Sequence, residues 1–382
     1  MTMLHIGFDA KRIVRNATGL GHYGRTLVTA LSAALGSKAR LHLYVPDRGR
    51  DDLRALVPAS PYIIYTLPAH CRTRIGRDLW RTRGIVADLK RDGITLYHGL
   101  TGELPVGIRR SGIRSVVTIH DLIFMRHPEY YNPIDVLIYK WKFRCACREA
   151  DRIVAISECT RRDVAELGHF PADRIDVVYQ SIDRRFRRTV TDGDRADVAR
   201  RYHLPSRYIL FVGTIEERKN AGLVIEALPQ IDPQVHFVMV GRQTAYTRRI
   251  LRRASALGVA DRVHAVSGVP DADMGAIYRM AEVFAYPSRY EGFGLPIVEA
   301  IQCGLPVVAA TGSCLEEAGG DACFYVGPDD VQAMADTLSR LLADPTLRQD
   351  CVKRSRAYIS RFENGDIARQ MTEVYRRTLE TD

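Results

Sequence analysis

Short runs rich in β-branched and other apolar residues alternate with helical stretches along the first half of the chain. The runs predict six strands, at Leu4–Phe8, Leu41–Val45, Leu96–Tyr97, Val116–Ile119, Ile153–Ile156 and Asp176–Tyr179. Strands separated by helices are typical of a parallel sheet with helices on both faces. The first half is therefore predicted to form a doubly wound α/β domain.

The alternation restarts after a charged, irregular stretch, Asp183–Arg201. Six more strands are predicted there, at Tyr208–Val212, His236–Val240, Val263–Val266, Val283–Tyr286, Val307–Ala309 and Cys323–Val326. A chain of 382 residues also exceeds what one hydrophobic core usually organises. We predict two Rossmann-like domains, residues 1–195 and 196–365, and a last helix in residues 366–382 that crosses back to the first domain. Because ligands bind beyond the carboxyl ends of parallel strands, the two sheets are expected to face each other across a deep cleft.

Net charge distinguishes the two halves. The chain has a formal charge of +10, and residues 1–190 hold 32 Lys and Arg against 19 Asp and Glu, whereas the remainder holds 23 against 26. A nucleic-acid-binding protein would place such charges on a recognisable reading motif or among exposed aromatic residues, and the sequence shows neither. The excess indicates an anionic small ligand or an anionic membrane surface, with no nucleic acid among the expected partners.

One basic segment, Arg72–Arg91, has a helix-compatible pattern of apolar residues that includes Leu79, Trp80 and Ile85. Such a helix either rests on a phospholipid surface or packs its apolar face on the domain and leaves its arginines in solvent. Both alternatives, and with the first a peripheral membrane contact, stay open at this point.

Nothing in the sequence predicts export. The amino terminus lacks the pattern of a secretory signal, and no apolar stretch approaches the roughly 20 residues that span a bilayer. The eight cysteines are scattered, and Cys145 and Cys147 point away from each other on a predicted helix. These features predict a cytoplasmic protein, and they leave open an association with the inner face of the membrane.

The loop after the predicted strand Tyr208–Val212 has the composition of an anion site. Gly213 and Thr214 make a small-residue turn, and two adjacent cations, Arg218 and Lys219, stand at the head of the next helix. A glycine, two cations and a helix amino terminus suit a diphosphate. Taken alone, the Arg-Lys pair is also compatible with a solvated loop.

A second loop, Ser288–Ala300, follows the predicted strand Val283–Tyr286. Its glycines permit close approach of a ligand to the backbone, and its proline suits the first turn of a helix. Glu291 at the mouth of that helix and Glu299 within it are expected to face the same ligand and to hold hydroxyls and phosphates. Acids that bracket a helix start commonly act as caps, but Glu291 lies too far ahead of the helix for that role.

These residues resemble the retaining glycosyltransferases of the group-1 class, family 4, which have the two-domain GT-B fold. The most specific motif is P-S-x-x-E-G-F-G-L-P-x-x-E-A, which contains Glu291 and Glu299. It is accompanied by G-T-x-x-x-R-K-N at Gly213–Asn220, C-G-x-P-V-V-A at Cys303–Ala309 and T-I-H-D-L at Thr118–Leu122. The motifs occur in the order typical of the family, and the resemblance covers most of the chain.

The resemblance implies a role for each matching residue. Arg218 and Lys219 would neutralise the donor diphosphate, which is the leaving group. Glu291 would hold hydroxyls of the donor sugar, and Glu299 would hold the ribose. The residues expected in catalysis are His120, Arg218, Lys219 and Glu291, and those expected to bind the donor are Gly19, Gly21, Gly213, Thr214, Gly294, Leu295 and Glu299.

The remaining roles concern the backbone and the first domain. Amides near Gly294 and Leu295 would meet phosphate or sugar. His120, at the end of a predicted strand, would reach across the cleft to the donor sugar near the reacting carbon. Gly19 and Gly21 match the family's glycine-rich loop, which lets the acceptor side approach the diphosphate.

The family mechanism implies transfer with retention at the anomeric carbon, by departure of the nucleotide and front-face attack of the acceptor hydroxyl, with the leaving phosphate taking the proton. An enzyme-bound intermediate on Glu291 is the alternative. No metal or other cofactor is expected for the chemistry. Asp271 and Asp273 look like a metal-binding pair, but they precede a predicted helix and suit compensation of its dipole.

The sequence departs from the family at the end of the first domain. Members often have a valine-rich strand followed by Asn-Gly and an acid, whereas this chain reads V-V-Y-Q-S-I-D over residues 177–183. The missing glycine affects the expected backbone path there but not the donor site.

The opening of the chain, Phe8–Arg12 with Thr18–Gly21, resembles members that build bacterial surface polysaccharides such as lipopolysaccharide, many of which use GDP-mannose. GDP-mannose is therefore favoured as the donor, with a UDP-sugar next, and the expected activity is that of a hexosyltransferase, specifically a mannosyltransferase. The expected acceptor is a growing glycan on a polyprenyl diphosphate or another lipid, which suits a basic first domain near an anionic membrane.

Other classes stay open. Gly19–Gly24 satisfies G-x-G-x-x-G, as in a nucleotide-cofactor oxidoreductase, but its glycines begin about ten residues past the first predicted strand rather than in a tight strand-to-helix turn. A sugar-nucleotide epimerase or a phosphorylase has the same fold but usually lacks this glutamate pair. The basic first half alone is compatible with a noncatalytic, membrane-docked assembly subunit.

Overall fold

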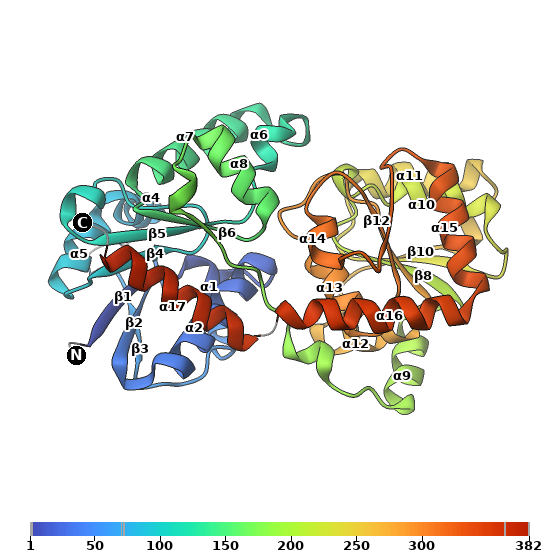
Figure 1. Cartoon of the computed structure of the whole chain (residues 1–382), viewed down its shortest axis with the longest axis horizontal. Helices are drawn as coiled ribbons and strands as arrows, with labels where there is room; N and C mark the ends of the chain where they lie inside the picture. The colour runs from blue at the N-terminus through green and yellow to red at the C-terminus, as the bar shows by residue number, and fades with distance from the viewer. Residues whose placement is uncertain (1–2, 70, 72, 363, 381–382) are drawn as a thin grey trace. The chain divides into compact units, whose positions relative to one another are not determined.

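The computed structural model describes residues 3–69, 71, 73–362 and 364–380 of the chain. It contains two compact units, each with its own parallel sheet (Figure 1). The first unit runs to Ser181 and resumes at Phe362, and the second is Ile182–Arg361. The prediction of two Rossmann-like α/β domains is confirmed.

The first unit is built on a seven-stranded sheet in the order β3-β2-β1-β4-β5-β6-β7. All its described pairings are parallel. Its strands are β1 (Leu4–Asp9), β2 (Ala39–Tyr44), β3 (Ile63–Thr66), β4 (Leu96–Gly99), β5 (Arg114–Ile119), β6 (Arg152–Ala155) and β7 (Ile175–Val177). The strand β3 is not among the predicted strands, although its sequence, I-I-Y-T, consists of residues that favour strands.

Two apolar cores cover the faces of this sheet, because successive strand residues point to opposite sides. Val116 packs in the core that contains α2 (Gly19–Leu35) and α17 (Asn364–Glu380). Val117 packs in the core that contains α5 (Ile85–Arg91), α7 (Pro133–Glu149) and α8 (Glu158–Gly168). The helices of the unit are α1 (Lys11–Arg15), α2 (Gly19–Leu35), α3 (Asp51–Arg54), α4 (Arg74–Leu79), the π-helical turn η2 (Trp80–Gly84), α5 (Ile85–Arg91), α6 (Ile123–Arg126), α7 (Pro133–Glu149), α8 (Glu158–Gly168) and α17 (Asn364–Glu380).

The last helix, α17, belongs to the first unit although it follows the second in sequence. In Figure 1 it lies beside α2, and the two helices are in contact. Met371, Val374 and Tyr375 are fully buried in the core formed by β1, β2 and α2. The carboxyl-terminal helix therefore completes the first hydrophobic core rather than extending the second.

The second unit is built on a six-stranded parallel sheet in the order β10-β9-β8-β11-β12-β13. Its strands, β8 (Tyr208–Val212), β9 (His236–Val240), β10 (Val263–Val266), β11 (Val283–Tyr286), β12 (Val307–Ala310) and β13 (Phe324–Val326), lie where the sequence predicts them. Its helices are α9 (Asp192–Tyr202), α10 (Gly222–Ala227), α11 (Ala245–Ala256), α12 (Asp271–Met280), α13 (Leu295–Gln302), α14 (Leu315–Gly319), α15 (Val331–Ala343) and α16 (Pro345–Ile359).

The first boundary between the units lies between Ser181 and Ile182 rather than at residue 195. The charged stretch expected to be a linker contains helix α9, which Thr191 caps. Arg201 and Tyr202 at the end of α9 donate to Asp273 of α12 at 2.7 and 2.6 Å. These contacts attach α9 to the second unit.

Within the predicted basic segment Arg72–Arg91, Arg72 lies outside the described residues, and the remainder forms α4, η2 and α5 in succession. The apolar residues of this segment are divided between the core and the surface. Trp80 and Ile85 are buried, but Ile75 and Leu79 are exposed, and Arg81 is largely buried rather than solvated. Among the described residues, no helix has the length and apolar character required to cross a bilayer.

Candidate functional site

The loop after β8 is compact because its backbone packs closely on its neighbours. Gly213 has φ +147°, where an L side chain is strained, and a Cβ there would lie 3.1 Å from Cδ of Lys219. Arg218 and Lys219 lie in the short 3-10 turn Glu217–Lys219, ahead of α10 rather than in its first turn. Thr214 is partly exposed beside them. The predicted cations are thus held at the carboxyl end of β8.

Four donors converge on one carboxylate oxygen of Glu291. Lys219 Nζ lies 2.7 Å and Arg218 Nη1 3.0 Å from Glu291 Oε1. The hydroxyls of Ser288 and Tyr286 donate to the same oxygen at 2.8 and 3.0 Å. No described residue donates to Oε2. Glu291 therefore holds both cations in place through one oxygen and keeps its second oxygen available.

The cations determine the charge of Glu291. Burial would raise the pKa of this carboxyl, but Lys219 and Arg218 outweigh burial and lower the pKa to about 2. Burial likewise opposes the charge of Arg218, whereas the carboxylates of Glu291 and Glu216 raise its pKa overall. Glu291 is consequently an anion throughout the physiological range, and Arg218 stays charged beside it.

Glu299 has different surroundings. It lies in α13 and accepts a hydrogen bond from Tyr278 of α12 at 2.9 Å between Oη and Oε2. Burial raises the pKa of Glu299 to about 7, although Arg185 and the Tyr278 hydroxyl act in the opposite direction. The two glutamates of the predicted pair thus differ in protonation at neutral pH, and the contacts described here do not join them.

Gly294 and Leu295 form the start of α13, with Gly294 in the N-cap position and Leu295 as the first helical residue. The first amides of a helix have no intrahelical partner and carry partial positive charge. Their position supports the expectation that backbone donors near these residues meet an anionic or hydroxylated ligand.

Asp271 and Asp273 are in the first turn of α12, as dipole compensation predicts. Each has a cationic partner within the second unit: Asp271 pairs with Arg185, and Asp273 pairs with Arg201. No group of three or more potential metal ligands occurs in the described parts of the chain.

In the first unit, His120 follows β5 and is held on three sides. Its Nε2 lies 2.9 Å from the carbonyl oxygen of Leu100, and its Nδ1 lies 3.2 Å from Nε2 of Gln180. The Tyr23 ring meets the imidazole edge-on with 4.7 Å between centroids. Burial lowers the pKa of His120 to about 4, so the ring is neutral at pH 7.

Gly19 and Gly21 lie in the first turn of α2 and not in a loop. A Cβ at Gly21 would lie 1.9 Å from the carbonyl oxygen of Asn16, whereas a Cβ at Gly19 would meet nothing within 4 Å. Position 21 therefore requires glycine because α2 packs closely against the backbone of Asn16. Since α1 separates β1 from these glycines, the dinucleotide fingerprint is absent here.

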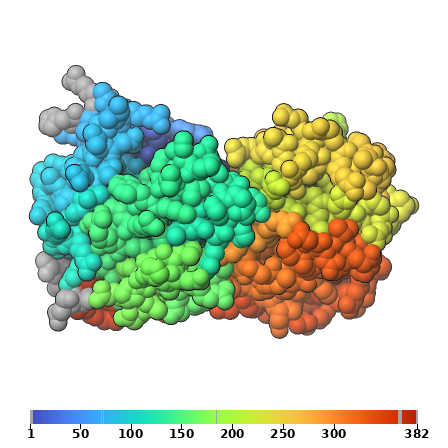
Figure 2. Space-filling view, turned by 90° about the horizontal axis from the view of Figure 1, so that it is seen from above, coloured from blue at the N-terminus to red at the C-terminus, as the bar shows by residue number. Residues whose placement is uncertain are grey.

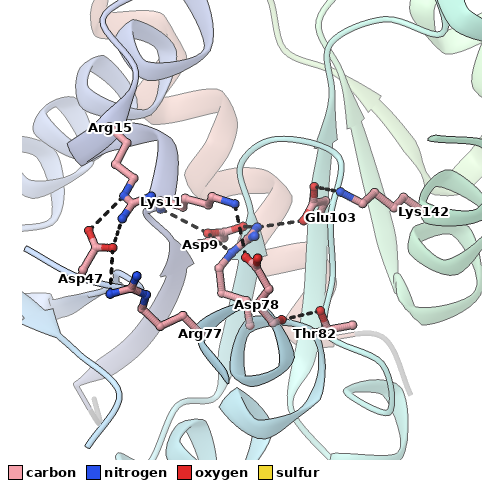
Figure 3. A network of polar contacts seen from close by, with 10 residues as sticks. Asp9, Lys11, Arg15, Asp47, Arg77, Asp78, Thr82, Glu103 and Lys142 are labelled. Carbon is pink, nitrogen blue, oxygen red and sulfur yellow. Dashed lines mark hydrogen bonds and ion pairs between the residues drawn. The ribbon is translucent and has the colours of Figure 1, made fainter. Parts of the chain in front are cut away.

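A network of charged side chains that the sequence does not single out lies near the carboxyl ends of β1 and β4 (Figure 3). Arg81 donates to Asp9 at 2.6 Å and to Glu103 at 2.8 Å, and Lys142 of α7 donates to Glu103 at 2.9 Å. Burial raises the pKa of Glu103, but Arg81 and Lys142 outweigh it and lower the pKa to about 2. Asp9 and Glu103 follow predicted strands, whereas Arg81 and Lys142 lie in helices.

His120 and this network border one cavity of about 300 Å³ in the first unit. Its polar lining includes Glu103, Asp121 and Lys142, and its aromatic lining includes Tyr131 and Tyr139. Aromatic faces beside charged hydrogen-bonding groups are suited to a sugar ring and its hydroxyls. The full lining is Arg12, Leu20, Thr101, Gly102, Glu103, Ile119, His120, Asp121, Leu122, Phe124, Tyr131, Tyr139, Lys142 and Phe143.

Two family models match the chain. The one described as glycosyl transferases group 1 matches residues 199–358, and the one described as Glycosyltransferase Family 4 matches residues 18–186. Together the two matches include the donor-side cluster, His120 and all the cavity-lining residues except Arg12.

Known proteins are similar to the chain in sequence and in structure. It is 29% identical over 286 residues to an O-antigen chain mannosyltransferase B of Escherichia coli, a match that covers 74% of each chain. It is 28% identical over 303 residues to the serotype-specific mannosyltransferase WbdA of the same organism, a match that covers 75% of this chain and 37% of WbdA. Anabaena HepE, crystallised with UDP and glucose, has a TM-score of 0.72 at 19% identity, with 98% of this chain and 100% of HepE covered.

Proposed function

Because the chain belongs to the group-1 glycosyltransferases and has their GT-B fold, we propose that it transfers mannose from GDP-mannose, with retention, to a glycan or polyprenyl-linked acceptor in bacterial polysaccharide biosynthesis. Both of these relatives are named mannosyltransferases, which supports mannose as the sugar. A UDP-sugar is the second candidate donor, since HepE was crystallised with UDP.

The convergence of Arg218 and Lys219 on one oxygen of Glu291 is the observation that carries this proposal. The two cations are desolvated and held in place before any ligand arrives, so they need little rearrangement to receive a diphosphate. In the proposed reaction the bond between the anomeric carbon and the β-phosphate oxygen breaks, and the electron pair leaves with the phosphate. The acceptor oxygen bonds to the anomeric carbon on the same face, and its proton passes to the leaving phosphate.

Glu291 acts in this scheme as an anchor for the cations and as an acceptor for donor-sugar hydroxyls through Oε2. Oε1 accepts hydrogen bonds from Lys219, Tyr286 and Ser288 and pairs with Arg218. A covalent intermediate on Glu291, the alternative, would therefore have to form through Oε2, the oxygen that this proposal assigns to donor-sugar hydroxyls. Glu299 is proposed to hold the ribose and His120 to contact the donor sugar. We propose that the chemistry needs no metal ion.

Thermal shift with nucleotides tests the donor site. GDP is expected to raise the melting temperature more than UDP, ADP or TDP, and NAD is expected to leave it unchanged. A shift by NAD alone would contradict the proposal that the protein is a transferase.

Two further measurements test the chemistry. Transfer should persist in EDTA. Nuclear magnetic resonance of the anomeric proton of the product should show the same anomeric configuration as in the donor.

We also propose that the protein is cytoplasmic and binds the inner face of the membrane through α7. Four apolar side chains, Ile134, Leu137, Ile138 and Trp141, are 44–69% exposed. Their spacing of three and four residues puts them on one face of the helix. In Figure 2 the teal and green part of the chain, which includes α7, lies on the surface that faces the viewer.

The charge beside this apolar face suits an anionic lipid surface. Lys140 and Arg144 of α7 have no acidic partner among the described residues. Basic residues that flank an apolar helix face favour the interface of an anionic bilayer. The membrane would then lie on the same helix that supplies Tyr139 and Lys142 to the cavity, where a lipid-linked acceptor would be presented.

Flotation with vesicles tests the membrane contact separately from activity. Vesicles that contain phosphatidylglycerol should bind the protein, and those of phosphatidylcholine alone should bind it less. The double variant Leu137→Glu, Trp141→Glu should lose binding, whereas Leu56→Glu, at a position 60% exposed outside α7, should retain it. Equal binding by both variants would contradict a role for α7.

A further inference from the structure

His120 is held in a single neutral form by its hydrogen bonds. The carbonyl oxygen of Leu100 can only accept, so Nε2 of His120 must carry the hydrogen in the 2.9 Å contact between them. In a neutral ring, Nδ1 is then bare and acts as an acceptor. The side-chain nitrogen of Gln180 lies 3.2 Å from Nδ1. The amide therefore donates to Nδ1, while Nε2 donates to Leu100.

Gln180 comes from the place where the sequence departs from the family pattern. It lies in the segment after β7, one residue before the last residue of this part of the first unit. Its side chain is largely buried, with 8% exposed. The segment that leads into the second unit is thus joined to the end of β5, 60 residues away in sequence, through this amide.

We propose that Gln180 is a positioning residue for the transfer reaction, which keeps the ring of His120 oriented and keeps its Nδ1 free of a proton. The amide blocks that nitrogen by donating to it, and the carbonyl of Leu100 orients the opposite side of the ring. The kinetic part of this inference rests on the proposed function, but the protonation of His120 is independent of it.

The other groups described near His120 do not hydrogen-bond to its Nδ1. Tyr23 contributes the edge of its ring, and its hydroxyl lies 3.0 Å from that of Thr118. His98 is neutral, because burial lowers its pKa to about 3, and it lies between Tyr375 and Thr118. The charged groups that border the same cavity are Arg12, Glu103, Asp121 and Lys142.

Replacement of Gln180 by glutamate reverses the polarity of this contact. A carboxylate can only accept, so it should draw a proton onto Nδ1 and make His120 an imidazolium that still donates to Leu100. In the wild-type protein His120 should stay neutral from pH 5.5 to 8, whereas in Gln180→Glu it should titrate within or above that range. Gln234→Glu, at an exposed position in the loop before β9, is the matched control.

Nuclear magnetic resonance of protein with ¹⁵N-labelled histidine measures this directly, without substrate. The variant His120→Gln identifies the signal of His120 among the 11 histidines. A proton on Nδ1 in Gln180→Glu and a bare Nδ1 in the wild type are expected. Identical His120 signals in the two proteins over the whole pH range would overturn the proposal, whether or not the protein proves to be a transferase.

Kinetics give the second readout. Gln180→Ala should lower kcat roughly tenfold and change KM for the donor less than about twofold, because the ring loses its orientation but the donor cluster is intact. Gln180→Asn restores an amide and should recover part of the loss. Gln180→Glu should acquire an ionisation in the kcat profile, with activity rising as pH rises and the imidazolium loses its proton. Wild-type kcat in all three variants would contradict the positioning role.

Discussion

The donor-side cluster of the second unit and the His120 site of the first unit are assembled in different ways. Two segments, residues 213–220 and 288–299, together with Tyr286 at the end of β11, supply the cluster around Glu291. His120 instead meets Leu100, Gln180 and Tyr23, which come from three distant parts of the chain. A site built from contiguous loops leaves a motif in the sequence, whereas a site assembled by topology leaves isolated residues.

The largest expected effect concerns the second unit. Lys219→Met removes one of two cations from the leaving group, so kcat should fall about 10²- to 10³-fold while KM for the donor changes much less. Lys353→Met, at an exposed position on α16, should leave kcat unchanged. Steady-state kinetics measure both, and wild-type kcat in Lys219→Met would remove the cluster from the mechanism.

The two glutamates should respond to pH in opposite ways. Because the pKa of Glu299 is raised to about 7, the folded protein binds a proton that the unfolded chain has released, and this contribution to stability is lost as pH rises from about 4.5 to 7. Glu299→Gln should abolish that part of the pH dependence of the free energy of unfolding. The expected effect is up to about 3 kcal/mol. The same variant should also weaken donor binding.

Glu291, whose pKa is lowered to about 2, contributes stability that is fully present above about pH 4.5 and is lost as pH falls toward 2. Glu291→Gln should therefore leave the slope between pH 5 and 8 unchanged. Denaturation by urea at several pH values compares the two variants. Equal slopes for Glu299→Gln and the wild type would show that Glu299 is not protonated at pH 6.

In the first unit, the two glycines of α2 should differ in tolerance. Gly21→Ala places a Cβ against the Asn16 carbonyl and should lower the free energy of unfolding by about 1–3 kcal/mol. Gly19→Ala meets open space and should change it by less than about 0.5 kcal/mol. Similar values for both would contradict the close packing of α2 on the chain before it.

The smallest expected effect concerns the link between α17 and the sheet. Tyr375 lies 2.7 Å from Nδ1 of buried His98, so Tyr375→Phe leaves that nitrogen without a partner and should cost about 1–2 kcal/mol of unfolding free energy. Tyr62→Phe, in a tyrosine that is not fully buried, is the control and should cost little. Thermal unfolding measures both, and equal melting temperatures would show that the contact contributes nothing.

The fold was accessible from the sequence because it depends on local patterns. Strands such as Tyr208–Val212 are continuous apolar runs in the sequence, and the structure has strands at the predicted ranges. The strand β3 was missed although its residues, I-I-Y-T, also favour a strand. The stretch Asp183–Arg201 looked like a linker because α9 buries little apolar surface of its own, and only its contacts with Asp273 show that it is packed.

The sequence by itself determined the two α/β units, the family and the candidate donor residues, because these depend on periodicity and on motifs within single loops. Tertiary structure alone decided which residues meet: both cations converge on one oxygen of Glu291, α17 completes the first core, and Gln180 contacts His120. It also decided that burial raises the pKa of Glu299 to about 7. Burial and contacts between residues far apart in the chain set the charge and the orientation of these side chains. A local sequence pattern predicts neither burial nor such contacts.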